Sequence, residues 1–301
     1  MTHTLTPHLW DTLETGAWSS SQDLAEALTW LLYARWLEGE TGLFPLADCD
    51  KRWSFWRELS LRQRFRHLRE SVWPFLQSRA PMTGHLLGLI LPTLPFAIPD
   101  AVALSQLLDL IEAHPAQELL EALLPLLDIE EPTTEVLAEA IAALGLAAEE
   151  VVWEPHCRSG RFLATCARTL QQRHWRTIWA EPEKLRRFRQ QQFFGRVQRR
   201  PEALLSAMNL LLAGQLCPGL DGYSLPWPPP SLIWVLAPEP DRAALLSLLA
   251  PGGRLVIWQP GSRGHLPLSG GQLEILEAPM TRQLKEAPAT YISLPATAKG
   301  A

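Results

Sequence analysis

The spacing of apolar residues changes near residue 131 of this 301-residue chain, and this change constrains the fold more than any other feature. Before it, apolar residues recur every three or four positions, as in "SSSQDLAEALTWLLYARWLEGE". Such spacing is typical of amphipathic helices that begin at a Ser or Asp cap. No convincing strand pattern occurs in this part. We therefore expect an all-α domain over residues 1–130.

After residue 131, short apolar runs alternate with helical stretches. Strands are expected in "EVVWEP", "TIWAE", "SLIWVLAP" and "RLVIWQP", and helices in "RFLATCARTLQQR", "PEALLSAMNLLLAG" and "DRAALLSLLAPGG". A further helix should begin at Thr133 or Thr134 and end near Gly145. The segments "LEILEAP" and "TYISLPA" suit an antiparallel hairpin. The alternation predicts an α/β domain with a largely parallel sheet over residues 131–301.

The composition favours a folded cytoplasmic protein with no membrane partner. Hydrophobic residues make up 47% of the chain, which is enough for a sizeable core. The first residues lack the basic start and apolar run of a signal peptide. The most apolar stretch, "LLGLILPTLPFAIP", is interrupted by Pro92, Pro95 and Pro99, and it is shorter than the roughly 20 residues that span a bilayer.

The four cysteines give no sign of a metal site. Cys49, Cys157, Cys166 and Cys217 form no CxxC pair, and no nearby histidine completes a metal-ligand spacing. We expect reduced and mostly buried thiols, and no metal cofactor.

The net charge of −5 conceals a separation of charges along the chain. No Lys or Arg occurs between Arg79 and Arg158, whereas "KRWSFWRELSLRQRFRHLRE" and "EKLRRFRQQQFFGRVQRR" are densely basic. A basic stretch can simply be a solvated helix face, but two stretches with interleaved aromatic residues also suit a polyanion such as DNA. The candidate nucleic-acid contacts are Arg186, Arg187, Arg189, Arg196, Arg199 and Arg200.

The segment "EVVWEPHCRSGRFLATCARTL" has the form of a loop between a strand and a helix. A structural turn explains it about as well as a ligand site does. A site is favoured because Glu154, Glu181 and Asp221 should each follow the end of a successive strand, where ligands of α/β sheets bind. The candidate cofactor-binding residues are Glu154, Pro155, His156, Cys157, Ser159, Gly160, Phe162, Glu181 and Asp221.

Several segments resemble the modification subunits of type I restriction systems, which are S-adenosylmethionine-dependent, adenine-specific DNA methyltransferases. "WEPHCRSGRFL" resembles their DP-x-C-G-S-G-G-F loop, "MNLLLAG" their Met-Asn-Leu run, and "LLSLLAPGGRLVIWQPG" their Leu-x-Pro-Gly-Gly-Arg strand entry. "LWDTLETGAWSSSQDLAEALTWLLYARWLEGE" looks like the start of their helical N-terminal domain. The segments occur in the family's order at both ends of the chain.

The resemblance implies a fold, a cofactor and partners. The fold would be a class I S-adenosylmethionine-dependent methyltransferase-like (Rossmann-like) sheet, preceded by the all-α domain. The cofactor would be S-adenosylmethionine, and the partners DNA and a specificity or nuclease subunit. The helical region from about Leu9 to Leu127 would mediate assembly, because "ALTWLLYARWL" is apolar on more than one helix face.

Two departures from the family pattern bear on activity. Arg158 and Arg161 replace loop glycines, so we expect backbone strain of about 1–3 kcal/mol and a side chain in the cofactor's space. Adenine methyltransferases carry Asn or Asp, two prolines and an aromatic residue after the fourth strand. Here the degenerate motif is Ala237, Pro238, Glu239 and Pro240, and no Asn or Asp precedes two prolines anywhere in the chain.

Three hypotheses follow. The chain is a degenerate methyltransferase subunit that acts in DNA binding or in assembly of a restriction-modification or defence-type complex. Alternatively, it is an active S-adenosylmethionine-dependent methyltransferase with a nonstandard catalytic site. The third is an unrelated nucleotide-binding α/β protein, although neither GxGxxG nor GxxxxGK[ST] is present.

Overall fold

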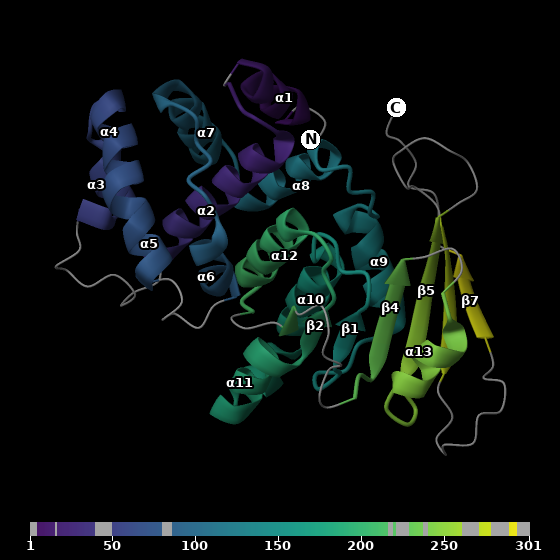
Figure 1. Cartoon of the computed structure of the whole chain (residues 1–301). Helices are drawn as coiled ribbons and strands as arrows, with labels where there is room; N and C mark the ends of the chain where they lie inside the picture. Colours follow the sequence, from purple (N-terminus) through teal and green to yellow (C-terminus); the bar gives the residue numbers. More distant parts are fainter. Residues whose placement is uncertain are drawn as a thin grey trace. The chain divides into compact units, whose positions relative to one another are not determined.

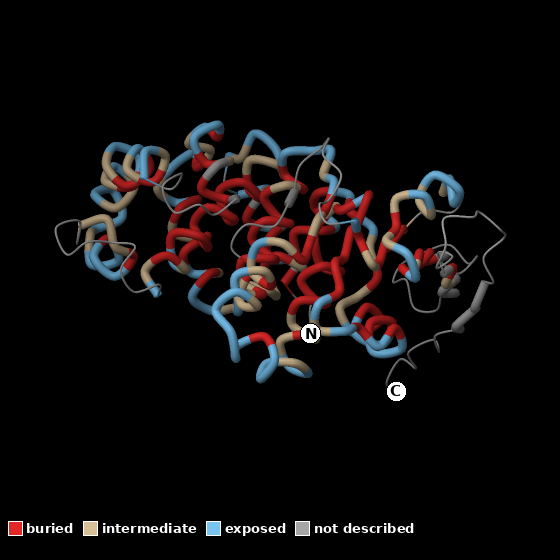
Figure 2. The backbone as a smooth tube through the Cα atoms, turned by 90° about the horizontal axis from the view of Figure 1, so that it is seen from below, coloured by how far each residue is buried: buried red, intermediate tan, exposed pale blue. Residues whose placement is uncertain are grey.

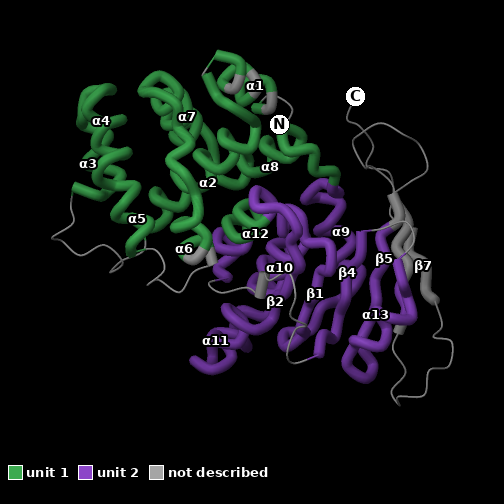
Figure 3. Tube along the Cα trace, in the orientation of Figure 1, with its two compact units in different colours: residues 1–130, 203–209 green, residues 131–202, 210–301 purple. Residues whose placement is uncertain are grey.

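The computed structural model describes residues 5–15, 17–39, 50–79, 86–215, 219–220, 229–236, 240–260, 271–277 and 289–293. It divides into two compact units (Figure 3). Unit 1 comprises Met1–Glu130 and Ala203–Asn209, and unit 2 comprises Glu131–Glu202 and Leu210–Ala301. Helices of both units carry buried and exposed residues on different sides (Figure 2), as amphipathic packing requires.

The described residues before Glu131 form helices and the turns between them (Figure 1). The elements are α1 (Leu5–Thr15), α2 (Ser21–Gly39), α3 (Trp53–Arg57), α4 (Leu61–His67), the π-helical turn η3 (Leu68–Val72), α5 (Trp73–Arg79), α6 (Leu86–Ile90), the 3₁₀ turn η5 (Leu91–Thr93), α7 (Ala101–Ala113) and α8 (Ala116–Leu126).

Helix α2 is buried on every side over three turns, which bears on the expected assembly role of the helical region. An unbroken stretch of eleven residues, Leu24–Ala34, is buried. Trp30 packs on Trp73, with ring centroids 4.9 Å apart, and on Phe96 at 6.0 Å. The excess of apolar residues in "ALTWLLYARWL" is therefore accounted for by burial, and it gives no support to a partner surface on this helix.

The elements of unit 2 begin with α9 (Thr134–Leu144), which Thr133 caps and Gly145 ends in a left-handed conformation, as predicted. They continue with β1 (Val152–Glu154), α10 (Arg161–Trp179), α11 (Pro182–Gln191), β2 (Phe193–Gly195), α12 (Arg200–Leu212, of which Ala203–Asn209 falls in unit 1), β3 (Gly219–Leu220), β4 (Leu232–Leu236), α13 (Arg242–Leu248), β5 (Arg254–Pro260), β6 (Gly271–Glu277) and β7 (Ala289–Ser293).

The strands form one sheet in the order β3-β2-β1-β4-β5-β6-β7. The five strands from β3 to β5 pair in parallel, and β6 pairs antiparallel to both β5 and β7. The expected hairpin is therefore present. The parallel part confirms the predicted Rossmann-like sheet, whose strand ends at one edge supply loops to a common site.

Apolar side chains cover both faces of the sheet. On one face Ile233, Val235, Leu255 and Ile257 form a buried cluster with Leu249, against which residues of α13 pack. On the other face, Phe162 of α10 stacks on Trp234 with ring centroids 4.2 Å apart, and Trp234 in turn lies 6.2 Å from Trp258. Successive residues of β4 thus point to opposite helices, as strand geometry requires. The near-continuous apolar run "LIWVL" follows from this burial on both faces.

The predicted strand "TIWAE" is wrong. Thr177–Trp179 is the end of α10, and the second strand is instead β2, three residues long and preceded by α11. A short apolar run has the same appearance in a strand and in a helix that buries one side. Here the inward-facing residues are Gln171, His174 and Ile178, and their spacing of three and four positions is a helical rather than an extended pattern.

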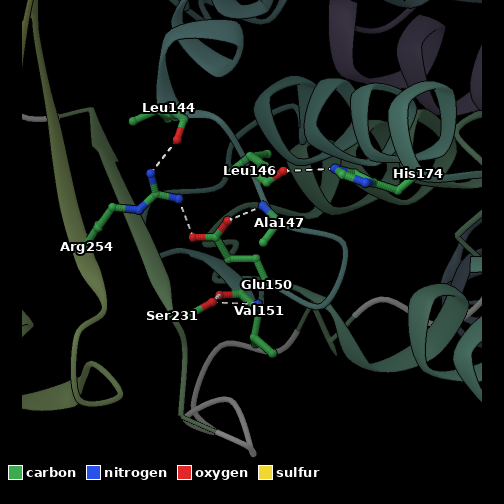
Figure 4. A network of polar contacts seen from close by, with 8 residues as sticks. All are labelled: Leu144, Leu146, Ala147, Glu150, Val151, His174, Ser231 and Arg254. Carbon is green, nitrogen blue, oxygen red and sulfur yellow. Dashed lines mark hydrogen bonds and ion pairs between the residues drawn. The ribbon is translucent and has the colours of Figure 1, made fainter. Parts of the chain in front are cut away.

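A polar network ties together the amino ends of β1, β4 and β5 (Figure 4). The Arg254 guanidinium, at the start of β5, donates to the Leu144 carbonyl and forms an ion pair with Glu150. The Ala147 N–H donates to the other Glu150 oxygen at 2.9 Å. The Val151 N–H donates to Ser231 Oγ at 2.8 Å. This edge of the sheet is thereby fixed.

Candidate functional site

The candidate site is the loop between the carboxyl end of β1 and α10. It contains one glycine, Gly160, which caps the 19-residue helix in a left-handed conformation (φ 72°). Only glycine adopts such a conformation without cost. The unpaired N–H groups at a helix start carry partial positive charge, so this position suits a carboxylate or phosphate.

A side chain of the same chain already lies at this position. Glu131 Oε1 accepts a hydrogen bond from the Ser159 backbone N–H at 2.9 Å, and Glu131 Oε2 accepts one from the Ser159 hydroxyl. Ser159 itself is fully buried. Two donors of the loop, both from the residue before the N-cap of α10, are therefore engaged by an internal carboxylate.

The arginines of the loop do not strain its backbone, and the expected strain is wrong. Among the described residues other than glycine, positive φ occurs only at Ala17 and Asp128. Arg161 begins α10 in a helical conformation because Gly160 absorbs the turn. Its side chain is buried, donates to the Pro132 carbonyl at 2.7 Å and leaves Nε without a partner. The buried Arg161 side chain thus joins the start of α10 to the segment just before α9.

Glu154 lies at the end of β1, only 6% exposed, and one of its oxygens has no hydrogen-bond partner. Burial raises the pKa of this carboxyl well above its ordinary value. The negative charge of Glu131 raises it further, and a hydrogen bond with Cys157 acts in the opposite direction. The surroundings of Glu154 therefore disfavour its charged form.

The other predicted loop residues take different roles. Pro155 is buried, and Cys157 is buried with its N–H donating to the Arg196 carbonyl at 3.0 Å. His156 is exposed, and its pKa is lowered by partial desolvation and by the charges of Arg158 and Arg196. The loop thus brings Cys157, Ser159 and Glu154 together inside the protein, while His156 faces outward.

Glu181 does not close a strand, so the reason for assigning it to a ribose is wrong. It caps α11 at the far end of α10, where it is exposed and pairs with Lys184 at 3.1 Å. The residue that follows β2 is Arg196, which is exposed and carries the opposite charge. Asp221 directly follows β3 and lies outside the described residues, so its role stays a prediction.

The remaining candidates are dispersed. Ala237, Pro238 and Glu239 directly follow β4 and lie outside the described residues, and Pro240 is half-buried. The basic residues do not all follow the second strand as the sequence suggested. Arg186, Arg187 and Arg189 lie on α11, before β2, and Arg196, Arg199 and Arg200 follow β2.

Neither a metal site nor a reactive thiol is found in the part of the chain that the structure describes. No group of three His, Cys, Asp or Glu side chains there is arranged to hold a metal. Cys157 and Cys166 are free and buried, and burial raises the pKa of the Cys166 thiol well above its ordinary value. No helix among these residues is long and apolar enough to cross a membrane.

As arranged, the described loop fits S-adenosylmethionine poorly. Glu131 already holds the Ser159 donors, and burial raises the pKa of the Glu154 carboxyl at the end of β1. A basic residue follows β2, where such folds place an acid for ribose hydroxyls.

Comparison with known proteins identifies relatives by structure and not by sequence. No family model matches the chain, and no curated protein matches it. A chain of a type I R-M system, solved in a study of complex assembly and conformational transition, superposes with a TM-score of 0.56 at 15% identity. The match covers 87% of this chain and 66% of that one.

A modification subunit of a putative type I restriction enzyme from Vibrio vulnificus YJ016 superposes with a TM-score of 0.50 at 14% identity. The match covers 85% of this chain and 66% of that one. The chain thus spans just under two thirds of both relatives. At such identity the likeness is one of fold, and it agrees with the helical unit followed by a mostly parallel sheet. The chain has the fold of the modification subunits of type I restriction-modification systems.

Proposed function

We propose that this chain is a non-catalytic, methyltransferase-like subunit that acts in DNA binding or in assembly of a restriction-modification or defence-type complex. The observation that carries the proposal is the engagement of Ser159 by Glu131. The two Ser159 donors, just before α10, serve an internal carboxylate, and this structural role of the loop would compete with cofactor binding.

The sequence after β4 supports the same conclusion. Transfer of a methyl group to adenine needs acceptors for the amino hydrogens and an aromatic ring that stacks on the flipped base. Ala237 offers no side-chain acceptor, and Pro240 offers no aromatic ring. The arginines of α11 and of the segment after β2 would bind DNA. A specificity or nuclease subunit would supply the activities that this chain lacks.

The cofactor part of the proposal is tested by calorimetric titration with S-adenosylmethionine. We expect no binding by the unchanged protein at millimolar cofactor. Glu131→Gln weakens the internal contact because a neutral amide accepts these hydrogen bonds less strongly. Glu135→Gln on α9 is the matched control, because it removes the same charge from an exposed position. A micromolar dissociation constant for the unchanged protein overturns the proposal.

The alternative is an active S-adenosylmethionine-dependent methyltransferase with a nonstandard site, and the buried Glu154 carboxyl, whose pKa is raised, favours it. A carboxylic acid held neutral can act as a general acid or a hydrogen-bond donor. Incubation with cofactor carrying a labelled methyl group and duplex DNA separates the two functions. Incorporation that is lost in Glu154→Gln supports the alternative, and its absence supports the non-catalytic subunit.

A further inference from the structure

Two exposed tryptophans mark a surface at the end of α10. Trp175 is 55% exposed and Trp179 is 49% exposed, whereas Trp30, Trp56, Trp234 and Trp258 are fully buried. Residues four apart in a helix lie on one face, so the two indoles are neighbours. Exposed tryptophan loses the benefit of burial, and a pair of them marks an interaction surface.

Contacts on the inner side of α10 fix its last turn, so that both rings face outward. α10 is kinked at His174, whose φ of −121° and ψ of 20° are not helical. His174 Nε2 bonds to the Leu146 carbonyl at 3.2 Å, as Figure 4 shows. Ile178, between the two tryptophans, is buried. The last turn is thus anchored from inside while both indoles face solvent.

Arginines accompany both rings. The Arg176 guanidinium carbon lies 5.4 Å from the Trp175 ring centroid, and that of Arg189, on α11, lies 5.5 Å from the Trp179 ring centroid. These are cation–π distances. Phe188 is buried beside Arg189 and packs on Phe193 at 5.8 Å, which fixes α11 to the sheet. The surface therefore combines flat aromatic groups and flat cationic groups on two adjacent, anchored helices.

The charge around this surface is strongly positive. Residues 173–189, which form the end of α10 and most of α11, contain six Lys or Arg and two Glu, a net charge of +4, within a chain whose net charge is −5. Both glutamates are paired locally, Glu181 with Lys184 and Glu183 with Arg186. A partner that is polyanionic and offers flat aromatic groups is complementary to this surface in charge and in shape.

We propose that α10 and α11 bind nucleic acid with unpaired bases, with phosphates on the arginines and bases stacked on Trp175 and Trp179. The proposal rests on the DNA contact in the proposed function, and it names the strand state that this contact prefers. Bases inside a duplex are stacked on each other and cannot stack on indoles, whereas those of a single strand can. Phosphates alone would need no tryptophan.

This surface is distinct from the loop at the carboxyl end of β1. His174 bonds to Leu146, and Arg187 approaches the Glu149 carbonyl at 3.5 Å, and both partners precede β1. The surface therefore lies toward the amino ends of the strands. A strand bound there does not require the cofactor loop to open, so its binding should not change with Glu131→Gln.

The test measures fluorescence anisotropy of the full chain with a labelled oligothymidine of 20 nucleotides and with a blunt duplex of 20 base pairs. The variants are Trp175→Ala with Trp179→Ala, the same pair changed to Phe, and Arg176→Gln with Arg189→Gln. Phe55→Ala, which removes an exposed aromatic side chain from α3, is the matched control. Thermal unfolding of each variant confirms that it is folded.

We expect the double alanine variant to bind the single strand at least 10-fold more weakly, with phenylalanine restoring most of the affinity. The arginine variant should bind more weakly and with a shallower salt dependence, since each lost phosphate contact removes about 0.7 from the logarithmic slope. Phe55→Ala should bind as the unchanged protein does.

Three outcomes overturn the inference, and they separate it from the proposed DNA contact. Single-strand binding that is unaffected by the tryptophan changes leaves the DNA contact intact and rejects stacking. If neither oligonucleotide binds at 50 mM salt, both the inference and the proposed DNA contact are rejected. Tryptophan-dependent binding of polyglutamate but of neither oligonucleotide assigns the surface to an acidic protein instead.

Discussion

Two buried glutamates stand at opposite ends of the first strand and have opposite surroundings. Glu150, 8% exposed, uses both carboxylate oxygens, one in the ion pair with Arg254 and the other with the Ala147 N–H. Glu154, 6% exposed, has no cationic partner among its described contacts and leaves one oxygen unpaired. The two residues are four positions apart in one short segment.

The two ends of β1 lie at different edges of the sheet. We call the amino edge, which the polar network fixes, the structural edge, and the carboxyl edge, which holds the candidate site, the functional edge. A buried charge that is paired and hydrogen-bonded fixes its neighbours, whereas a buried acid that leaves one oxygen without a partner costs free energy. At the carboxyl edge, Arg161 Nε is also unsatisfied. That is the edge at which α/β sheets bind ligands. The loop therefore has the polarity of a binding site, although the Glu131 side chain is hydrogen-bonded to Ser159 within it.

The largest expected effect comes from breaking the ion pair between Arg254 and Glu150 at the structural edge. Arg254→Met removes the partner of Glu150 and leaves a buried carboxylate with one hydrogen bond, which should cost about 3 kcal/mol of the free energy of unfolding of unit 2. Urea denaturation measures it. The double variant Glu150→Gln, Arg254→Met should be less destabilised than the single variant, because its buried group is neutral.

Arg242→Met, at an exposed position on α13, is the control and should change the free energy of unfolding by less than about 0.5 kcal/mol. If Arg254→Met is equally neutral, the ion pair of the structural edge contributes nothing, and the contrast between the two ends of β1 disappears.

The second prediction concerns the functional edge and depends on pH. The raised pKa of Glu154 means that the folded protein binds more protons than the unfolded one above the ordinary carboxyl pKa of about 4.3. Its stability therefore falls as pH rises through that value. Glu154→Gln cannot titrate, so it should be more stable than the unchanged protein by about 1–3 kcal/mol at pH 7.5 and equally stable near pH 4.

Melting temperatures of both proteins between pH 4 and pH 8 measure this effect, and exposed Glu135→Gln is the control. Parallel profiles for Glu154→Gln and the unchanged protein would show that the Glu154 carboxyl titrates normally. The two edges would then differ less than their contacts indicate.

The sequence predicts most of the strands better than it predicts the placement of the candidate site residues. β1, β4, β5 and the C-terminal hairpin carry long or β-branched apolar runs with turn residues at their ends, and all are found where expected. β2 has only the residues "FFG" after a glutamine-rich helix end, which is too short to show a strand period. The missed strand led to the wrong placement of Glu181.

The occupant of the loop could not be predicted either. Glu131 lies 28 residues before Ser159, at the start of the α9 segment, and nothing in its neighbourhood marks it as a partner of the loop. The loop itself follows from the strand–turn–helix pattern around Gly160, which is local. Contacts between distant segments depend on how α9 packs on α10, and no periodicity encodes that contact directly.

The smallest expected effect sharpens the comparison at one hydrogen bond of the structural edge. The Ser231 hydroxyl accepts from the buried Val151 N–H at 2.8 Å, just before β1 and β4 begin to pair. Ser231→Ala leaves that N–H without its acceptor, whereas the Val151 carbonyl still accepts from the Ser231 and Leu232 N–H groups. The loss should be about 1 kcal/mol, because only one donor is left unsatisfied. Hydrogen exchange at Val151 should accelerate accordingly, while exchange at Glu154, at the other end of β1, stays unchanged. Ser247→Ala, exposed on α13, controls for loss of a hydroxyl. Equal acceleration at both ends of β1 would mean that the strand opens as one unit and that its two ends are not independent.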